Sequence, residues 1–349
     1  TRGFIVDLDD GHEIAVSQWV TPKRTRSYPY ARVYDTLQKP RRAAIIPLVK
    51  DEGKDGDRDY LQWDTVSLMS LLNVYVIPAY YAEAEKNPDY PNKITNQTFD
   101  YGYIADRLKQ LKRYQGDALH WNLRELENIS TVADLCAEHY YNKIESETGV
   151  TMHGETRFRA KIEAMGEDID RFKESSRDAA QSAQKGEAAS EQLSENVLNE
   201  KGEITLRNFL GGIYYFTVDE VAHIDDYVIV VEKKHSSSGA LPSEDDIKDG
   251  LLKLVLYMNI QEVTVNGEDT PVIACLGLTG KDFPGTATPS QDPTRIPGLS
   301  STYRDRLVSV FREANENGLL VFAADKDVAA STQSRLIDSA LREAKSESD

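Results

Sequence analysis

The sequence predicts a mixed α/β fold, in which helices flank a mixed β-sheet. Two observations support this prediction. Strand-like and helical segments alternate through the second half of the chain, and nearer the start of the chain a strand is followed by a loop, a helix and a second strand. The segments of the second half are strands at 213–218, 228–231, 272–278 and 319–323, with helices at 245–259 and 303–316. Such alternation favours helices packed on the faces of one sheet.

Length and composition indicate a globular protein of about two domains. The chain has 349 residues, of which 40% are hydrophobic and 9% aromatic, so it is long and apolar enough to bury a core. No apolar run reaches the roughly 18 to 20 residues of a membrane span, and the first ten residues lack the pattern of a signal peptide. We therefore expect a cytoplasmic protein with no membrane partner.

The first part of the chain begins with an irregular, partly β segment of roughly 40 residues. An apolar strand at 43–49, an acidic loop at 51–59, a helix at 63–72 and a second strand at 74–81 then predict a βαβ-type unit. Residues 101–143 show a broken helical periodicity, which indicates helices.

Composition divides the chain into four regions. They are an N-terminal α/β region at 1–125, a helical and polar connecting region at 126–200, a core region at 201–330 and a charged tail at 331–349. The stretch 157–198 is dominated by Ala, Ser, Glu, Gln and Lys. This composition predicts either an exposed helix or a mobile linker.

The stretch 217–234 predicts a β-hairpin, because β-branched residues flank a turn at 225–226. Folding at this turn brings Asp219, near the start of the first strand, close to Glu232, which stands 13 positions later. Side chains two positions apart in a strand share a face, so Glu232 and Lys234 point the same way. The hairpin is thus expected to gather two carboxylates and one ammonium in a small volume.

Two carboxylates and an ammonium suit a magnesium ion and a phosphate. Carboxylate oxygens are hard ligands, and Mg²⁺ keeps several waters while it takes further oxygens from a phosphate. A bound ion polarises a phosphodiester and acidifies water, while a lysine stabilises charge nearby. Glu220 competes with Asp219 for the first acidic position, but strand alternation turns Glu220 to the other face. We expect phosphodiester hydrolysis, with Asp219, Glu232 and Lys234 as the catalytic residues.

Asp219, followed by an apolar strand that ends in Glu232 and Lys234, resembles the core of the PD-(D/E)xK nucleases, a superfamily that includes many type II restriction endonucleases. The resemblance implies a restriction-endonuclease-like core in which Asp219 and Glu232 hold Mg²⁺ and Lys234 is the lysine of the ExK element. It covers residues 212–276, where the strand pair is followed by a helix over the sheet. Val218 stands where the superfamily often has a proline.

The net charge of −17, from 41 Lys and Arg against 58 Asp and Glu, argues on its own against nucleic acid, because a polyanion normally meets a basic surface. Total charge does not report how the charges are distributed, however. Basic residues interleaved with aromatic ones near the N-terminus, and the serines after the hairpin, resemble a backbone-binding surface. These candidate DNA-binding residues are Lys23, Arg24, Arg26, Arg41, Arg42, Ser236, Ser237 and Ser238.

The expected function is therefore that of a type II restriction-type endonuclease, which hydrolyses phosphodiester bonds in double-stranded DNA with Mg²⁺. The region 1–125 is then a place for DNA recognition, and the resemblance implies a homodimer, since two active sites cut the two strands of a symmetric target. Two alternatives remain open. One is a repair or structure-specific nuclease with the same core, and the other is a non-catalytic acidic adaptor or regulatory protein. The acidic charge also fits a high-salt cytoplasm.

Overall fold

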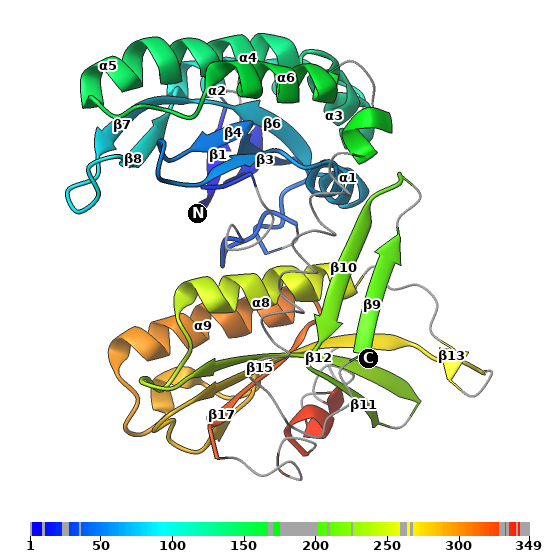
Figure 1. The fold of residues 1–349 in the computed structure, drawn as a ribbon. Coiled ribbons are helices and arrows are strands. Elements are labelled where there is room, and N and C mark those ends of the chain that lie inside the picture. Colours follow the sequence, from blue (N-terminus) through cyan, green and yellow to red (C-terminus); the bar gives the residue numbers. More distant parts are fainter. Residues whose placement is uncertain are drawn as a thin grey trace. The chain divides into compact units, whose positions relative to one another are not determined.

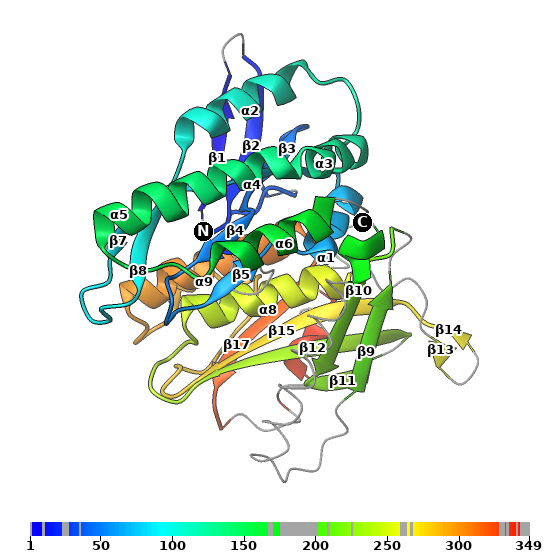
Figure 2. The ribbon, with the colours of Figure 1, turned by 45° about the horizontal axis from the view of Figure 1, so that its top comes forward.

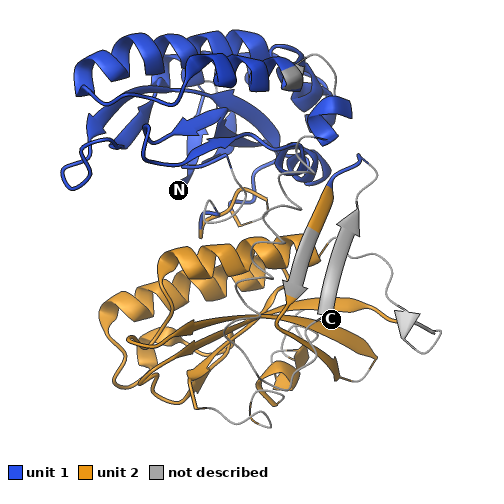
Figure 3. Ribbon diagram, in the orientation of Figure 1, with its two compact units in different colours: residues 1–29, 37–179, 209–212 blue, residues 30–36, 180–208, 213–349 orange. Residues whose placement is uncertain are grey.

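The computed structural model forms two compact units (Figure 1; Figure 3). Unit 1 comprises Thr1–Pro29, Leu37–Ala179 and Phe209–Gly212, and unit 2 comprises Tyr30–Thr36, Ala180–Asn208 and Ile213–Asp349. The structure describes residues 2–8, 11–22, 28–34, 36–166, 170–174, 202–207, 210–224, 226–258, 264–265, 268–327, 332, 335–339 and 341–342. Both units combine strands with helices, which confirms the predicted mixed α/β class. No helix within these ranges is long and apolar enough to cross a membrane.

A four-stranded sheet with the order β1-β2-β3-β6 forms the centre of unit 1. Its strands are β1 (Arg2–Asp7), β2 (Glu13–Gln18), β3 (Arg42–Pro47) and β6 (Tyr75–Ala79). The first pair is antiparallel and the other two are parallel. Helix α1 (Trp63–Leu71) links the parallel neighbours β3 and β6, so the predicted βαβ unit is present.

Unit 1 also contains two hairpins, one between β3 and β6 in the sequence and one after β6. One consists of β4 (Val49–Asp51) and β5 (Arg58–Tyr60), the other of β7 (Tyr81–Lys86) and β8 (Ile94–Phe99). Both pairs are antiparallel. The acidic stretch predicted as a loop at 51–59 is therefore the turn of a hairpin, and its two ends are strands.

Helices cover the sheet of unit 1 on the side that Figure 1 shows uppermost. They are α2 (Tyr101–Arg113), α3 (Ala118–Glu127), α4 (Ile129–Ala137), a π-helical turn (Glu138–Ile144), α5 (Glu145–Thr148) and α6 (Glu155–Gly166). Helix α2 begins where the Asp100 carboxylate accepts the Tyr103 N–H. Its buried residues Ile104, Leu108 and Leu111 follow the i, i+4, i+7 spacing of one helix face.

Unit 2 contains a five-stranded sheet with the order β11-β12-β15-β17-β16. Its strands are β11 (Glu220–Ile224), β12 (Tyr227–Ser236), β15 (Val272–Gly280), β16 (Thr286–Ala287) and β17 (Leu320–Asp325). Strands β12, β15 and β17 are parallel, whereas β11 and β16 are antiparallel edge strands. Two further strand pairs and a 3-10 turn belong to the unit: β9 (Gly202–Arg207) with β10 (Ile213–Val218), β13 (Thr264–Val265) with β14 (Glu268–Asp269), and the turn Pro293–Arg295.

Helices lie on both faces of this sheet. Helix α8 (Glu244–Tyr257) connects β12 to β15, α9 (Ser301–Glu316) connects β15 to β17, and the two lie side by side on one face (Figure 1; Figure 2). On the other face the helical residues 335–339 and 341–342 bring Ile337 and Leu341 onto an apolar cluster of strand side chains. The central strands are therefore covered on both sides, which explains their continuous apolar runs.

A buried ion pair ties the segment Tyr30–Thr36 to helix α9 within unit 2. Arg32 Nε lies 3.0 Å from Glu313 Oε1, and the two side chains are 3% and 0% exposed. The Glu313 carboxylate also accepts the Thr36 hydroxyl at 2.9 Å and the Asn317 amide at 3.0 Å. A buried carboxylate with this many partners is costly to leave unpaired, so the pair fixes where this segment docks.

Arg32→Met is expected to destabilise the protein by about 3–5 kcal/mol, because it leaves the buried Glu313 carboxylate without its cation. Guanidinium unfolding of the full chain, followed by circular dichroism, measures the loss. Arg159→Met is the matched control, since Arg159 pairs with Asp134 and Glu155 at a surface where its side chain is 53% exposed. Equal shifts in the two variants would contradict the assignment of this pair to the core of unit 2.

Candidate active site

The predicted hairpin is present, and it places Asp219 at a corner of the chain. Strand β10 ends at Val218 in a ladder with β9, and β11 begins at Glu220 in the ladder with β12. Glu220 faces Val231 in that antiparallel register. Asp219 therefore stands one position before the ladder, level with the Glu232 end of β12, and its Oδ2 accepts the Lys233 backbone N–H at 2.7 Å.

Strand β12 sends alternate side chains to the two faces of the sheet. Ile229 and Val231 join the apolar cluster beneath the sheet. Lys233 shares that face and pairs with the Glu220 carboxylate. Glu232 and Lys234 point to the opposite face, where both contact side chains of α8. The alternation predicted for this strand therefore separates Lys233 from the two candidate residues.

Glu232 is almost completely buried, with 1% of its side chain exposed. Its Oε1 forms ion pairs with two ammonium groups, Lys234 Nζ at 2.9 Å and Lys253 Nζ at 2.8 Å. Its Oε2 lies 3.5 Å from the Tyr257 hydroxyl. Burial raises the pKa of Glu232, the two lysines oppose that rise, and the charge of Asp219 adds to it. The charge of Asp219 acts on Glu232, so the two carboxylates lie near each other.

Lys234 is held as an ammonium between two carboxylates. Its Nζ lies 2.7 Å from Asp249 Oδ2 in addition to the contact with Glu232. Burial works to lower the pKa of Lys234, but Glu232 and Asp249 more than offset it and hold this pKa above its ordinary value. Lys234 is therefore a charged hydrogen-bond donor at neutral pH.

Helix α8 supplies three partners that sequence reasoning missed. Asp249, Lys253 and Tyr257 recur every four residues, so they lie along one face of the helix, over Glu232 and Lys234. The signal in the sequence is the spacing of these three residues, together with Lys253 as a charged residue inside the apolar run 251–256. Burial and the charge of Glu232 raise the pKa of Tyr257, which keeps its hydroxyl protonated. We call Asp219, Glu232, Lys234, Asp249, Lys253 and Tyr257 the Glu232 cluster.

The donor chemistry of the Glu232 cluster fits a magnesium ion. Asp219, at the corner before β11, and Glu232, on β12, supply hard carboxylate oxygens, as Mg²⁺ requires. The ammonium contacts of Lys234 and Lys253 fall on Glu232 Oε1 and Asp249 Oδ2, so Glu232 Oε2 and the Asp219 carboxylate keep oxygens for a cation. Within the described part of the chain, no three His, Cys, Asp or Glu side chains form a preformed metal-binding group. Water and phosphate oxygens would complete the coordination.

The predicted DNA-binding residues that the structure describes lie in different environments. Arg41 donates from Nη1 to Lys112 O at 3.1 Å and from Nη2 to Tyr114 O at 2.6 Å, so it caps the carboxyl end of α2. Arg42 is half-buried in β3. Ser236 Oγ accepts the Gly239 N–H at 3.0 Å in the loop after β12, and the next two serines are exposed there: Ser237 and Ser238. Three of the predicted residues lie outside the described residues: Lys23, Arg24 and Arg26.

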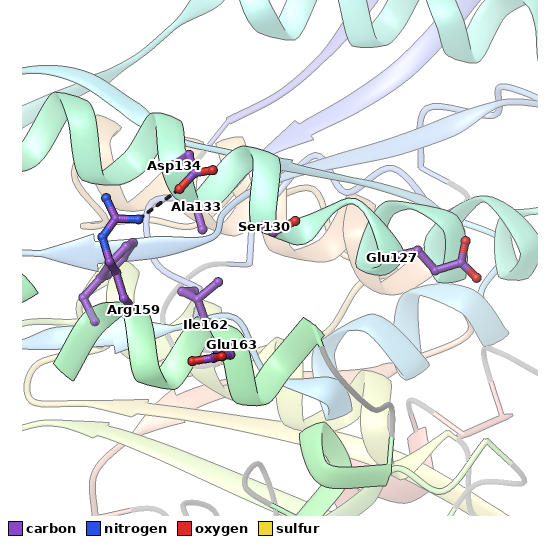
Figure 4. A pocket seen from close by; sticks show the side chains of 8 residues that line it. Glu127, Ser130, Ala133, Asp134, Arg159, Ile162 and Glu163 are labelled. Atoms are coloured by element: carbon purple, nitrogen blue, oxygen red, sulfur yellow. Dashed lines mark hydrogen bonds and ion pairs between the residues drawn. The ribbon is translucent and has the colours of Figure 1, made fainter. Parts of the chain in front are cut away.

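A groove of about 350 Å³ lies between α4 and α6 of unit 1 (Figure 4). Its buried lining residues are Ala133, Phe158 and Ile162, and its polar ones are Glu127, Ser130, Asp134, Arg159 and Glu163. Arg159 reaches Asp134 across the groove at 3.0 Å. None of these residues belongs to the Glu232 cluster.

In comparisons with known proteins, no family model, no curated protein and no solved structure matches this chain. The resemblance to the PD-(D/E)xK nucleases therefore rests on the hairpin residues and stays a prediction.

Gly250→Ala is expected to destabilise the protein by about 1–3 kcal/mol, although alanine is ordinarily the better helix former. A Cβ at Gly250 would lie 2.7 Å from Leu276 Cδ1 and 3.4 Å from Lys234 Cγ, so α8 would be pushed off the strand that carries the candidate site. Thermal unfolding of the full chain measures the effect. Gly154→Ala is the control, because a Cβ there meets nothing within 4 Å. A higher midpoint for Gly250→Ala would refute the close helix–strand contact.

Proposed function

We propose that this protein is a Mg²⁺-dependent endonuclease of restriction type that hydrolyses phosphodiester bonds in double-stranded DNA. One observation carries the proposal. The Glu232 carboxylate is 1% exposed, yet it lies beside a second carboxylate, Asp219, and two lysine ammonium groups. A structural core gains little from such an arrangement, because desolvating the charges offsets their attraction, whereas charged groups of this kind are common at catalytic sites.

The topology around the cluster also supports a nuclease core. A hairpin bears the acidic residues, helix α8 follows the strand that ends in Glu232 and Lys234, and β15 returns parallel to that strand. This is the strand pair followed by a helix over the sheet that the resemblance implies for residues 212–276. The rigid strand and the packed helix hold the reacting groups in fixed positions, as efficient catalysis requires.

In the proposed mechanism Asp219 and Glu232 would hold a magnesium ion, which would supply an acidic bound water and polarise the scissile phosphate. Water attacks phosphorus, so one P–O bond to the attacking oxygen forms and one ester P–O bond breaks. The attacking water releases one proton to solvent, and the departing oxygen takes up one proton from solvent. Lys234 remains an ammonium because its pKa is raised by Glu232 and Asp249. It therefore donates hydrogen bonds to negative charge that develops on the phosphate, and it does not act as the base.

Lys234→Ala is expected to lower DNA cleavage by at least about 100-fold, since it removes a preorganised donor to developing negative charge. Wild type and variant are incubated with unmethylated, phage-sized duplex DNA in Mg²⁺ or in chelator, and the products are separated on a gel. Lys248→Ala serves as the control, because Lys248 lies on α8 but pairs with the exposed Glu244.

The pattern of products separates the proposal from its alternatives. Discrete bands that require Mg²⁺ and Lys234 support a restriction-type enzyme, and a continuous smear supports a repair or structure-specific nuclease instead. Intact DNA at every salt concentration, with the wild type folded, would overturn the proposed activity in favour of a non-catalytic acidic protein. An equal loss of cleavage in the Lys248→Ala control would show that the effect is not specific to the Glu232 cluster.

A further inference from the structure

Two ammonium groups converge on one oxygen of the Glu232 carboxylate. Lys234 Nζ lies 2.9 Å and Lys253 Nζ 2.8 Å from Oε1. A carboxylate oxygen offers about two lone-pair positions, so both positions at Oε1 are filled by side chains of the protein. The other oxygen, Oε2, has only the long contact with the Tyr257 hydroxyl at 3.5 Å among the described residues.

The two lysines have different surroundings. Lys234 stands on the strand and divides its charge between Glu232 and Asp249. Lys253 reaches down from α8, and Glu232 is the carboxylate that it contacts. Lys253 therefore brings one positive charge to Glu232 from the side opposite the strand, at the distance of a charge-assisted hydrogen bond.

The charges of the cluster limit how many divalent ions it can take. With all groups ionised, Asp219, Glu232 and Asp249 carry three negative charges against two positive ones on Lys234 and Lys253. One divalent ion changes the net charge from −1 to +1, and a second would bring it to +3 in a place that is largely shielded from water. Like charges in such surroundings repel strongly, because the effective dielectric constant is low.

We infer that Lys253 takes the place of a second divalent cation, so that the Glu232 cluster binds a single ion. The inference deepens the proposed function and rests on it, since it concerns the ion that Asp219 and Glu232 would hold. In this arrangement Lys253 supplies a permanent positive charge beside Glu232, where a two-metal nuclease would need another ion. The enzyme then depends on one metal-binding event per active site.

Counting bound Mn²⁺ tests the inference without any measurement of DNA cleavage. The full chain is titrated with Mn²⁺, and the signal of the free ion is followed by electron paramagnetic resonance. The wild type is expected to bind one ion per chain. Lys253→Gln and Lys253→Met, which both remove the charge and leave Lys234 as the remaining ammonium at Oε1, are expected to bind two. Lys253→Arg keeps the charge and is expected to bind one.

Controls separate the possible failures. Lys248→Gln removes one charge from the same helix outside the cluster, and it is expected to bind one ion as the wild type does. Two ions in the wild type, or one ion in folded Lys253→Gln and Lys253→Met, would overturn the role of Lys253. No stoichiometric ion in the wild type would overturn the proposed metal-dependent function itself. Circular dichroism establishes whether each variant is folded. If one of the two charge-removing variants does not fold, the other still tests the inference.

Discussion

The burial of the Glu232 carboxylate is the constraint on which the rest of the candidate site depends. A carboxylate with 1% exposure inside a sheet-and-helix interface must be compensated, because an uncompensated buried charge costs several kcal/mol. Lys234 and Lys253 supply that compensation from the strand and from helix α8. The helix can approach closely because Gly250 has no side chain where Leu276 and Lys234 pack.

The two faces of β12 have different roles. Toward the C-terminal helical residues it presents Ile229 and Val231, which belong to an apolar cluster and fix the strand in the sheet. Toward α8 it presents Glu232 and Lys234. Because β12 pairs with β11 on one side and with β15 on the other, its backbone has little freedom to move. Charged groups mounted on such a strand keep their relative positions, which favours preorganised electrostatic catalysis.

The sequence was informative where local rules decide the structure. Strand alternation put Glu232 and Lys234 on one face, the turn at 225–226 brought Asp219 level with Glu232, and the apolar spacing of α8 predicted its buried face. What it did not reveal depends on docking. Asp249, Lys253 and Tyr257 belong to the site only because α8 sits over β12 in one particular register. Apart from the regular spacing of these three residues, nothing local to the helix indicates that register.

The same limit applies to the basic residues near the N-terminus. Arg41 looked like a DNA contact by composition, but in the structure its guanidinium binds the last carbonyls of α2, which lie about 70 residues further along the chain. The break between β10 and β11 at Asp219 was also missed, because the hairpin was expected to begin at residue 217, although the strand predicted at 213–218 matches β10. That break gives Asp219 its corner position, from which its carboxylate accepts the Lys233 N–H.

Anomalous diffraction from crystals soaked in Mn²⁺ tests the central claim most directly, because it locates a bound ion without reference to any reaction. The account predicts one anomalous peak per chain at coordination distance from the carboxylate oxygens of Asp219 and Glu232, and its loss in Asp219→Asn. A peak elsewhere on the chain, or full occupancy that persists in Asp219→Asn, would contradict the assignment of the Glu232 cluster as a catalytic metal site.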